Sequence, residues 1–171
     1  MKEIKLFEKW VKRSLNEHFV FKSYEDFSIV TDGYVGFKIS NKCKNYRRVI
    51  KEQTFQDLKE DFKIYNRKIE KIGVADIQKE FDISNKEKAI KMPFVYDNVY
   101  KARIFKNQEQ LVFVKDDFLK NIDLYNYEIY AGDPLHPLVF YSKDVSYITL
   151  PIRMCDFQYE IKEIQGELKC N

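Results

Sequence analysis

The fold is decided by residues 113–122, FVKDDFLKNI, in which a β-rich run leads directly into a short helical segment. The helix is expected to begin at Asp116-Asp117, because acidic residues in the first turn are stabilised by the helix dipole. Phe118, Leu119 and Ile122 then recur at helical spacing and predict an inward-facing side. Downstream, β-rich runs predict strands at 127–130, 138–141 and 145–150.

The first forty residues predict a helix followed by a hairpin. Ile4, Phe7, Val11 and Leu15 recur every three or four residues and form one apolar stripe. The β-rich runs 27–30 and 34–39 flank Thr31-Asp32-Gly33. Asp-Gly is a strong tight-turn signal, because glycine accepts a positive φ without strain.

The middle of the chain predicts a second, inserted amphipathic helix at about 54–72. Its apolar residues alternate between three- and four-residue spacings, and Thr54 is suited to cap its start and Gly73 to end it. Before it, Val49 and Ile50 are interpreted as part of a third strand. Further expected elements are a short helix at 76–81 and strands at 94–96, 100–105 and 111–114.

Composition is that of an ordinary globular protein, with 44% hydrophobic and 33% charged residues over 171 positions. The formal net charge of +3 is far below that of a small protein dominated by nucleic-acid binding. No apolar run is long enough to span a bilayer, and the first ten residues lack the apolar centre of a secretory signal. The three cysteines form no paired motif, so we expect a cytoplasmic protein without membrane contact.

Catalytic and cofactor motifs are not recognisable in the sequence. None of the five glycines lies in a phosphate-binding loop, and His18 and His136 stand apart from any nucleophile motif. The pair Asp116-Asp117 is better explained by the helix dipole than by metal binding, since adjacent helical residues do not face each other. We therefore predict no catalytic residue, no metal ion and no cofactor.

Aromatic residues are frequent, with 14 Phe and 12 Tyr. Bases of single-stranded nucleic acids stack on such rings, but most of these rings fall at core-facing positions of the predicted elements. The best local nucleic-acid pattern is Asn45-Tyr46-Arg47-Arg48, which combines an aromatic ring with cations. A solvated loop is the alternative interpretation of this stretch.

The order of elements in the last third resembles the end of the bacterial sliding clamp, the β subunit of DNA polymerase III. The strand-to-helix step at 113–122 is similar to an F-x-x-x-Y-L step in that family, and the segments beginning at Pro137 and at Leu150 resemble its closing strands. Near the front, Thr31-Asp32-Gly33 is similar to a turn of the clamp repeat. The resemblance implies an α+β clamp-like domain, with two helices on one face of antiparallel sheets, to which the predicted helix at 54–72 is added.

The resemblance also implies two binding surfaces. In the family, helices contact DNA phosphates without reading sequence, and the matching cations here are Lys5, Lys9, Lys12, Arg13, Lys115 and Lys120. A hydrophobic pocket of the family receives short peptides of polymerases, and its closing residues match Leu150, Pro151, Ile152, Arg153 and Met154. The alternatives are a solvated helix face for the cations and a simple edge-strand end for the proline segment.

Residues 1–154 are predicted to form a single clamp-like domain with an insertion at about 54–92, followed by a C-terminal extension at 155–171. We expect a non-enzymatic protein that associates with duplex DNA, serves replication or tethers a partner, and forms a homo-oligomer if it encircles DNA. The Lys- and Asn-rich composition suggests a phage or mobile element with an AT-rich host. One alternative is a protein-binding inhibitor or decoy of replication or defence machinery. Another is a metal-dependent nucleic-acid enzyme, with Glu25, Asp26 and Asp32 among its candidate acids.

Overall fold

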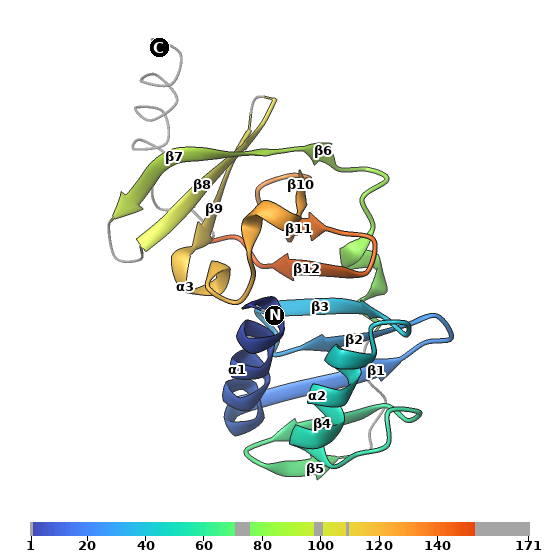
Figure 1. Cartoon of the computed structure of the whole chain (residues 1–171). Helices are drawn as coiled ribbons and strands as arrows, with labels where there is room; N and C mark the ends of the chain where they lie inside the picture. The colour runs from blue at the N-terminus through green and yellow to red at the C-terminus, as the bar shows by residue number, and fades with distance from the viewer. Residues whose placement is uncertain (1, 71–75, 98–100, 109, 153–171) are drawn as a thin grey trace.

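The computed structural model describes residues 2–70, 76–97, 101–108 and 110–152. The chain has an α+β fold of helices and antiparallel sheets, which confirms the predicted fold class (Figure 1). Its helices are α1 (Lys2–Glu17), α2 (Lys44–Thr54) and α3 (Asp116–Leu119), with 3-10 helices η1 (Gln78–Phe81) and η2 (Leu124–Asn126). Its strands are β1 (His18–Ser23), β2 (Phe27–Thr31), β3 (Val35–Ser40), β4 (Phe62–Tyr65), β5 (Lys68–Glu70), β6 (Glu87–Lys88), β7 (Ile90–Asp97), β8 (Lys101–Asn107), β9 (Gln110–Lys115), β10 (Glu128–Ala131), β11 (Leu138–Tyr141) and β12 (Val145–Thr149).

Nine strands form one antiparallel sheet in the order β5-β4-β1-β2-β3-β12-β11-β10-β6. Its centre is the β3–β12 pair, in which Phe37 lies opposite Tyr147. On either side of this pair the chain repeats one pattern, a helix followed by three antiparallel strands: α1 with β1–β3, and α3 with β10–β12. The hairpin at the front and the strands at the end therefore share one sheet.

A second, three-stranded sheet has the order β7-β8-β9. β9, the strand that leads into the predicted helix at Asp116, belongs to this sheet. On one side Phe105, Val112 and Val114 join the main core, and Phe105 packs edge-on against Phe140 of β11 with ring centroids 5.6 Å apart. The other side carries a separate cluster that includes Ile104.

The main core lies between one face of the large sheet and the three helices. Phe7 and Trp10 of α1 pack on Phe37 at centroid distances of 4.9 and 4.8 Å, and Phe37 packs on Tyr147 at 4.8 Å. Val49 and Ile50 of α2 and Leu119 of α3 join the same cluster. Most of the large aromatic residues thus serve the core, which explains the aromatic-rich composition.

The hairpin turn at Thr31-Asp32-Gly33 forms as predicted. Gly33 has φ of +93°, in the left-handed region that favours glycine. The carboxylate of Asp32 accepts hydrogen bonds from the backbone amides of Tyr34 and Val35 at 3.0 and 2.9 Å. Its other oxygen accepts from the indole Nε1 of Trp10 at 2.9 Å, so the turn also anchors α1 to the sheet.

The helix predicted at 54–72 is wrong. Thr54 ends a helix instead of starting one, because α2 occupies residues 44–54, where Val49 and Ile50 were interpreted as a strand. Beyond it lie β4 and β5, joined by Asn66 and Arg67 at φ of +47° and +63°, and these strands extend the large sheet. Gly73, the expected end of that helix, lies outside the described residues.

The other predicted elements form close to their expected positions, and 76–81 contains η1. β1 was not predicted from the sequence, and it pairs with both β2 and β4. Among the described helices, none is both long and apolar enough to cross a membrane. The proposed boundaries of the domain and of its insertion stay predictions, and the extension at 155–171 lies outside the described residues.

Candidate nucleic-acid interface

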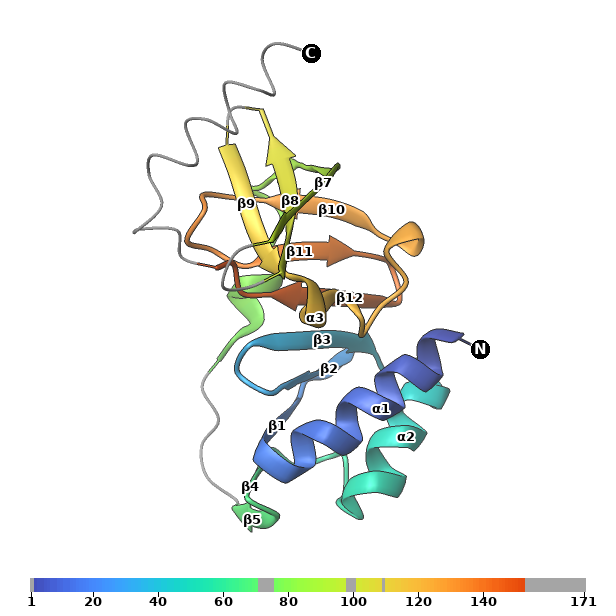
Figure 2. The same ribbon diagram turned by 90° about the vertical axis from the view of Figure 1, so that its left-hand side faces the viewer.

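The helices α1 and α2 lie side by side on the same face of the large sheet (Figure 2). α1 buries Phe7, Trp10, Val11 and Ser14, and the ring of Phe7 lies 4.9 Å from that of Tyr46 on α2. Because each helix buries one side, the opposite sides of both helices face solvent together.

The solvent-facing sides of these two helices form a basic surface, which we call the helix-pair face. Together the two helices carry nine Lys and Arg residues and four Glu residues, a net charge of +5, although the whole chain has only +3. The positive charge of the protein is therefore concentrated here, and the rest of the chain is slightly acidic. The exposed cations of the helix-pair face are Lys2, Lys5, Lys9, Lys12, Arg13, Lys44, Arg48 and Lys51.

Four of these cations are engaged with nearby acids. Lys12 pairs with Glu8 at 2.7 Å and Arg48 with Glu52 at 3.7 Å, each along its own helix. Lys2 reaches Asp123 at 3.0 Å, and Arg13 lies 3.8 Å from Asp32. Within the described part of the chain, Lys5, Lys9, Lys44 and Lys51 have no acidic partner. These four lysines are the cations most available to an anionic ligand.

The pattern Asn45-Tyr46-Arg47-Arg48 lies in the first half of α2 and is divided between its two sides. Arg48 is exposed, while Arg47 turns inward and donates hydrogen bonds to Ser28 Oγ at 2.7 Å and to Asn41 Oδ1. Tyr46 is half-buried against α1. Only part of this pattern is therefore free to bind a ligand, and Arg47 instead joins α2 to the sheet.

The exposed aromatic ring of Phe55 lies at the C-terminal end of the solvent-facing side of α2. Lys44, Arg48, Lys51 and Phe55 follow at helical spacings of four, three and four residues, so they lie on one side. Phe55 caps α2 in the left-handed conformation, with φ of +57°, and its side chain is 86% exposed. A bulky residue with positive φ is strained, and its apolar ring here is unburied. A base could stack on this ring beside the cations.

Lys115 and Lys120 flank α3, as predicted, but their surroundings are not basic. Lys120 pairs with Asp117 at 2.6 Å, and this bond raises the pKa of Lys120 and lowers that of Asp117. Asp116 pairs with Arg103 at 2.6 Å, and the Lys115 ammonium lies 5.8 Å from the centroid of the Phe118 ring. The two predicted sets of cations thus differ, since only the set on α1 lies in a basic surface.

The predicted peptide-binding residues begin directly after β12. Leu150 is 39% exposed, and its amide donates to the carbonyl of Tyr34. Ile152 is half-buried in the cluster of the three-stranded sheet, and its amide donates to the carbonyl of Phe113 at 2.7 Å. Pro151 between them is also half-buried. Arg153 and Met154 lie outside the described residues.

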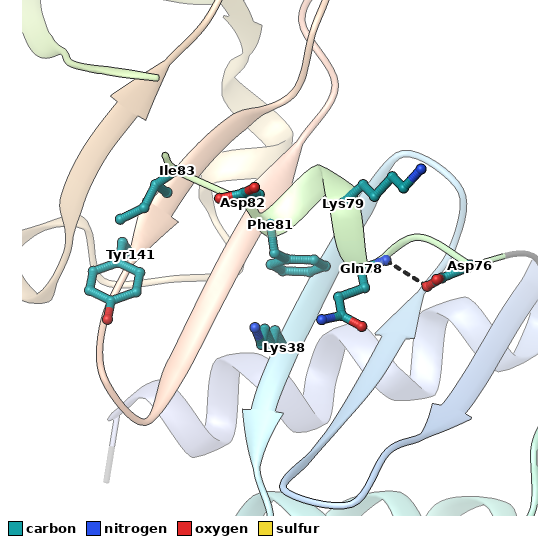
Figure 3. Close-up of a pocket in the computed structure, with 8 residues that line it drawn as sticks. All are labelled: Lys38, Asp76, Gln78, Lys79, Phe81, Asp82, Ile83 and Tyr141. Carbon is teal, nitrogen blue, oxygen red and sulfur yellow. Dashed lines mark hydrogen bonds between the residues drawn. The ribbon is translucent and has the colours of Figure 1, made fainter. Parts of the chain in front are cut away.

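An open pocket of about 520 Å³ lies where η1 crosses the large sheet on the side opposite α1 (Figure 3). Its lining has mixed charge and includes Lys38, Lys79, Asp76 and Asp82. Both carboxylates serve local structure: Asp76 accepts from the Tyr24 hydroxyl and the Gln78 amide, and Asp82 from the Ser84 amide. These hydrogen bonds lower the pKa of both acids. The pocket therefore offers no pair of free acids for catalysis.

The candidate acids of the enzyme alternative are not brought together. Asp26 and Asp32 lie at opposite ends of β2, and the Asp32 carboxylate is occupied by Trp10 and two amides. Among the described residues, no three His, Cys, Asp or Glu side chains gather in a group that could hold a metal ion. His18 contacts the backbone of Asp32, and His136 contacts Asp133; among the residues that the structure describes, no Ser, Thr or Cys side chain hydrogen-bonds to either ring.

Burial perturbs the tyrosines beneath the helix-pair face. Tyr147 is fully buried and donates to the carbonyl of Phe118 at 2.6 Å, and burial raises its pKa above the usual range. Burial and the neighbouring Glu3 carboxylate likewise raise the pKa of Tyr46 and Tyr127. These phenols stay neutral near pH 7 and are part of the scaffold.

No protein-family model matches the sequence, and no curated protein matches it. Solved structures with a similar chain path include the sliding clamp (DNA polymerase III subunit beta) of Bartonella birtlesii, with a TM-score of 0.44 and 10% identity over 82% of this chain and 59% of that chain. The DNA polymerase III subunit beta of Borrelia burgdorferi has a TM-score of 0.45 and 9% identity over 90% of this chain and 62% of that chain. A Eubacterium rectale protein described as a DNA polymerase III beta subunit has a TM-score of 0.37 and 12% identity over 90% of this chain and 64% of that chain. This chain spans less than two thirds of each of these structures, and the similarity is too distant to transfer their function.

Proposed function

We propose that this protein binds nucleic acid through the helix-pair face, without reading sequence and without catalysing a reaction. The observation that carries the proposal is the concentration of charge, since two adjacent helices hold a net +5 in a chain of net +3. Lysines on a rigid surface bind phosphates mainly by releasing counterions, which requires no base contacts. The proposed role is to hold a replication partner on DNA, in the manner of a clamp, as the sequence resemblance implies.

The four unpaired lysines set the expected strength and salt dependence. Each phosphate contact contributes a slope of about −0.9 to the dependence of log affinity on log salt for duplex DNA. With about four contacts, affinity should fall roughly a hundredfold between about 50 and 200 mM salt. A protein that binds DNA through apolar or base contacts would show a much weaker dependence.

The test is a fluorescence-anisotropy titration of labelled duplex DNA at several salt concentrations. The variant replaces Lys5, Lys9, Lys44 and Lys51 with Glu. The matched control replaces four exposed lysines elsewhere, Lys59, Lys68, Lys91 and Lys143, with Glu and so changes the net charge equally. We expect the control to retain much more affinity than the helix-pair variant. Equal losses would show that overall charge, not this surface, governs binding.

A peptide partner is the second part of this proposal. Leu150 is accessible next to Pro151, and Ile152, the residue that follows, packs in the cluster of the three-stranded sheet. An apolar peptide from a replication protein would dock here. Leu150→Glu tests this site better than a change at Ile152, because Ile152 is also packed against Phe113 and its replacement would disturb the fold. Unchanged peptide capture by Leu150→Glu would refute this part alone. We further propose that the protein forms a homo-oligomer and is located in the cytoplasm.

A further inference from the structure

The three-stranded sheet has an apolar face that points away from the main core, which we call the outer face. Strand register and alternation place Ala102, Ile104, Leu111 and Phe113 together on it. Ala102 is fully buried, and Ile104 and Phe113 are each only 2% exposed. The outer face is therefore shielded from water almost as completely as the main core.

The described neighbours of the outer face do not account for this shielding. Within the described part of the chain, the partly buried residues packed against it are Met92, Tyr96 and Ile152. Met92 and Tyr96 belong to β7 of the same sheet, and a face three strands wide and six residues long measures about 10 by 20 Å. Ile90, also on β7, is 65% exposed, so a place in this sheet does not by itself bury a side chain. A further apolar segment is needed to cover the outer face.

The chain arrives at the outer face where the described residues end. Ile152 packs in its cluster, and the Ile152 amide donates to the carbonyl of Phe113 on the edge strand β9 at 2.7 Å. Nineteen residues, 153–171, follow Ile152 in the sequence. Because these residues start beside the outer face, they reach it without a linker and at a high effective concentration.

The sequence of this segment has the apolar spacing of a surface helix. Met154, Phe157, Ile161 and Ile164 recur at intervals of three, four and three residues, and Gly166 is suited to end a helix. A helix over 153–165 would be about 20 Å long, which matches the length of the outer face. Four large apolar side chains on one side of such a helix are enough to cover the centre of the face.

The charges of the segment and of the sheet are complementary. Asp156, Glu160 and Glu163 fall together on one flank of the apolar stripe. By strand register Lys106 lies on the outer face as the partner of Leu111, and Lys115 as the partner of Ala102. A helix seated between these lysines therefore brings acids toward cations at the rim of an apolar contact.

We propose that residues 153–165 form an amphipathic helix that docks on the outer face of the three-stranded sheet. Met154, Phe157, Ile161 and Ile164 are the contacts that cover Ile104 and its neighbours. A helix held there excludes a partner peptide from this face and leaves Leu150 as the exposed apolar contact beside it. The proposal does not depend on whether the protein binds DNA.

The experiment is methyl NMR of the full-length protein with labelled isoleucine δ1 methyl groups. We expect nuclear Overhauser effects between the Ile104 methyl and the methyl of Ile161 or Ile164. A sample that mixes two differently labelled copies separates contacts within one chain from contacts between chains. The proposal is overturned if the wild-type protein shows no such effect, or if the effect arises only between two copies.

Two variants test the predicted side of the helix. Ile161→Glu should abolish the contacts with Ile104 and shift the Ile104 methyl resonance. Tyr159→Glu adds the same charge two positions earlier, on the opposite side of a helix, and should leave both unchanged. The methyl of Ile148, in a separate cluster, reports whether a variant is still folded, and if Ile161→Glu unfolds the protein the wild-type contacts decide. Contacts that survive Ile161→Glu, or that both variants remove equally, would overturn the proposal.

Discussion

Replacing Asp32 with Asn tests the contact by which the hairpin turn holds the first helix. In the native protein one oxygen of Asp32 accepts from the Tyr34 and Val35 amides, and the other accepts from Trp10 Nε1 at 2.9 Å. An Asn side chain of the same shape can still accept from the two amides. Its NH₂ group would then face the indole N–H, so two donors would oppose each other and the link to α1 would be lost.

The size of the effect follows from the charge of the acceptor. Hydrogen bonds to charged groups contribute about 1.5–3 kcal/mol, and the Arg13–Asp32 contact at 3.8 Å adds little because Arg13 is exposed. We therefore expect Asp32→Asn to lower the free energy of unfolding by about 2 kcal/mol. For a chain of this length, that loss corresponds to a decrease in Tm of roughly 4–8 °C.

The assay is urea and thermal unfolding followed by circular dichroism, with Trp10→Phe and the double variant measured alongside. Since both single changes remove the same hydrogen bond, the double variant should be less destabilised than their sum by about 1–2 kcal/mol. The control is Asp57→Asn at an exposed site whose carboxylate accepts from the Lys59 amide. A loss below about 0.5 kcal/mol for Asp32→Asn, or strictly additive losses in the double variant, would refute the assigned link.

Three further predictions concern stability. Gly36→Ala should lower the free energy of unfolding by about 1–3 kcal/mol, because a Cβ there would lie 3.2 Å from the Val30 carbonyl and 3.3 Å from Ile148 Cγ1. An unchanged free energy in urea unfolding would show that β2 and β12 can move apart to make room for the methyl group. Phe55→Gly should raise stability by roughly 0.5–1 kcal/mol, because glycine relieves the positive φ of +57° and only an exposed ring is lost; a destabilised variant would mean that the ring packs in solution. Stability should decline as the pH rises above about 10, because burial raises the pKa of Tyr147 in the folded protein, so the unfolded chain loses its phenolic protons first. Absorbance at 295 nm would record this ionisation together with unfolding, and ionisation of every tyrosine near pH 10 without loss of structure would contradict it.

The fold could be predicted from the sequence in those segments where the local pattern of apolar and turn residues agrees with the packing in the structure. The stripe of α1 and the strand-to-helix step at 113–122 place apolar residues on the side that the structure buries, and the Asp-Gly turn forms where its glycine predicts. Those signals are local, because a turn glycine and a helical stripe depend on few distant contacts. The pairing of β3 with β12 joins residues more than a hundred positions apart, and no local pattern in the sequence indicates it.

The segment after residue 40 was misinterpreted because its apolar residues fit both the spacing of a helix and the alternation of a strand. Phe62, Tyr65 and Ile69 match helical spacing, yet Phe62 and Ile64 are buried by strand alternation while Tyr65 is exposed. Asn66 could have identified the turn, since Asn adopts positive φ more readily than most residues. α2 was missed because its short stripe of Tyr46, Val49 and Ile50 is surrounded by polar residues.

Only the part of the candidate site that lies on α1 could be predicted from the sequence. The exposed lysines of α1 could be assigned from its stripe alone, since the buried side of a helix fixes its solvent-facing side. Lys44, Arg48 and Lys51 could not be added to them, because they belong to a helix that was not predicted.

The most direct test of the central claim is the salt dependence of duplex DNA binding by the wild-type protein and by the variant with Lys5, Lys9, Lys44 and Lys51 changed to Glu. We expect a slope of log affinity against log salt of about −3.6 for the wild-type protein and a slope close to zero for the variant. A wild-type protein that does not bind duplex DNA at low salt, or a variant with an unchanged slope, would contradict it.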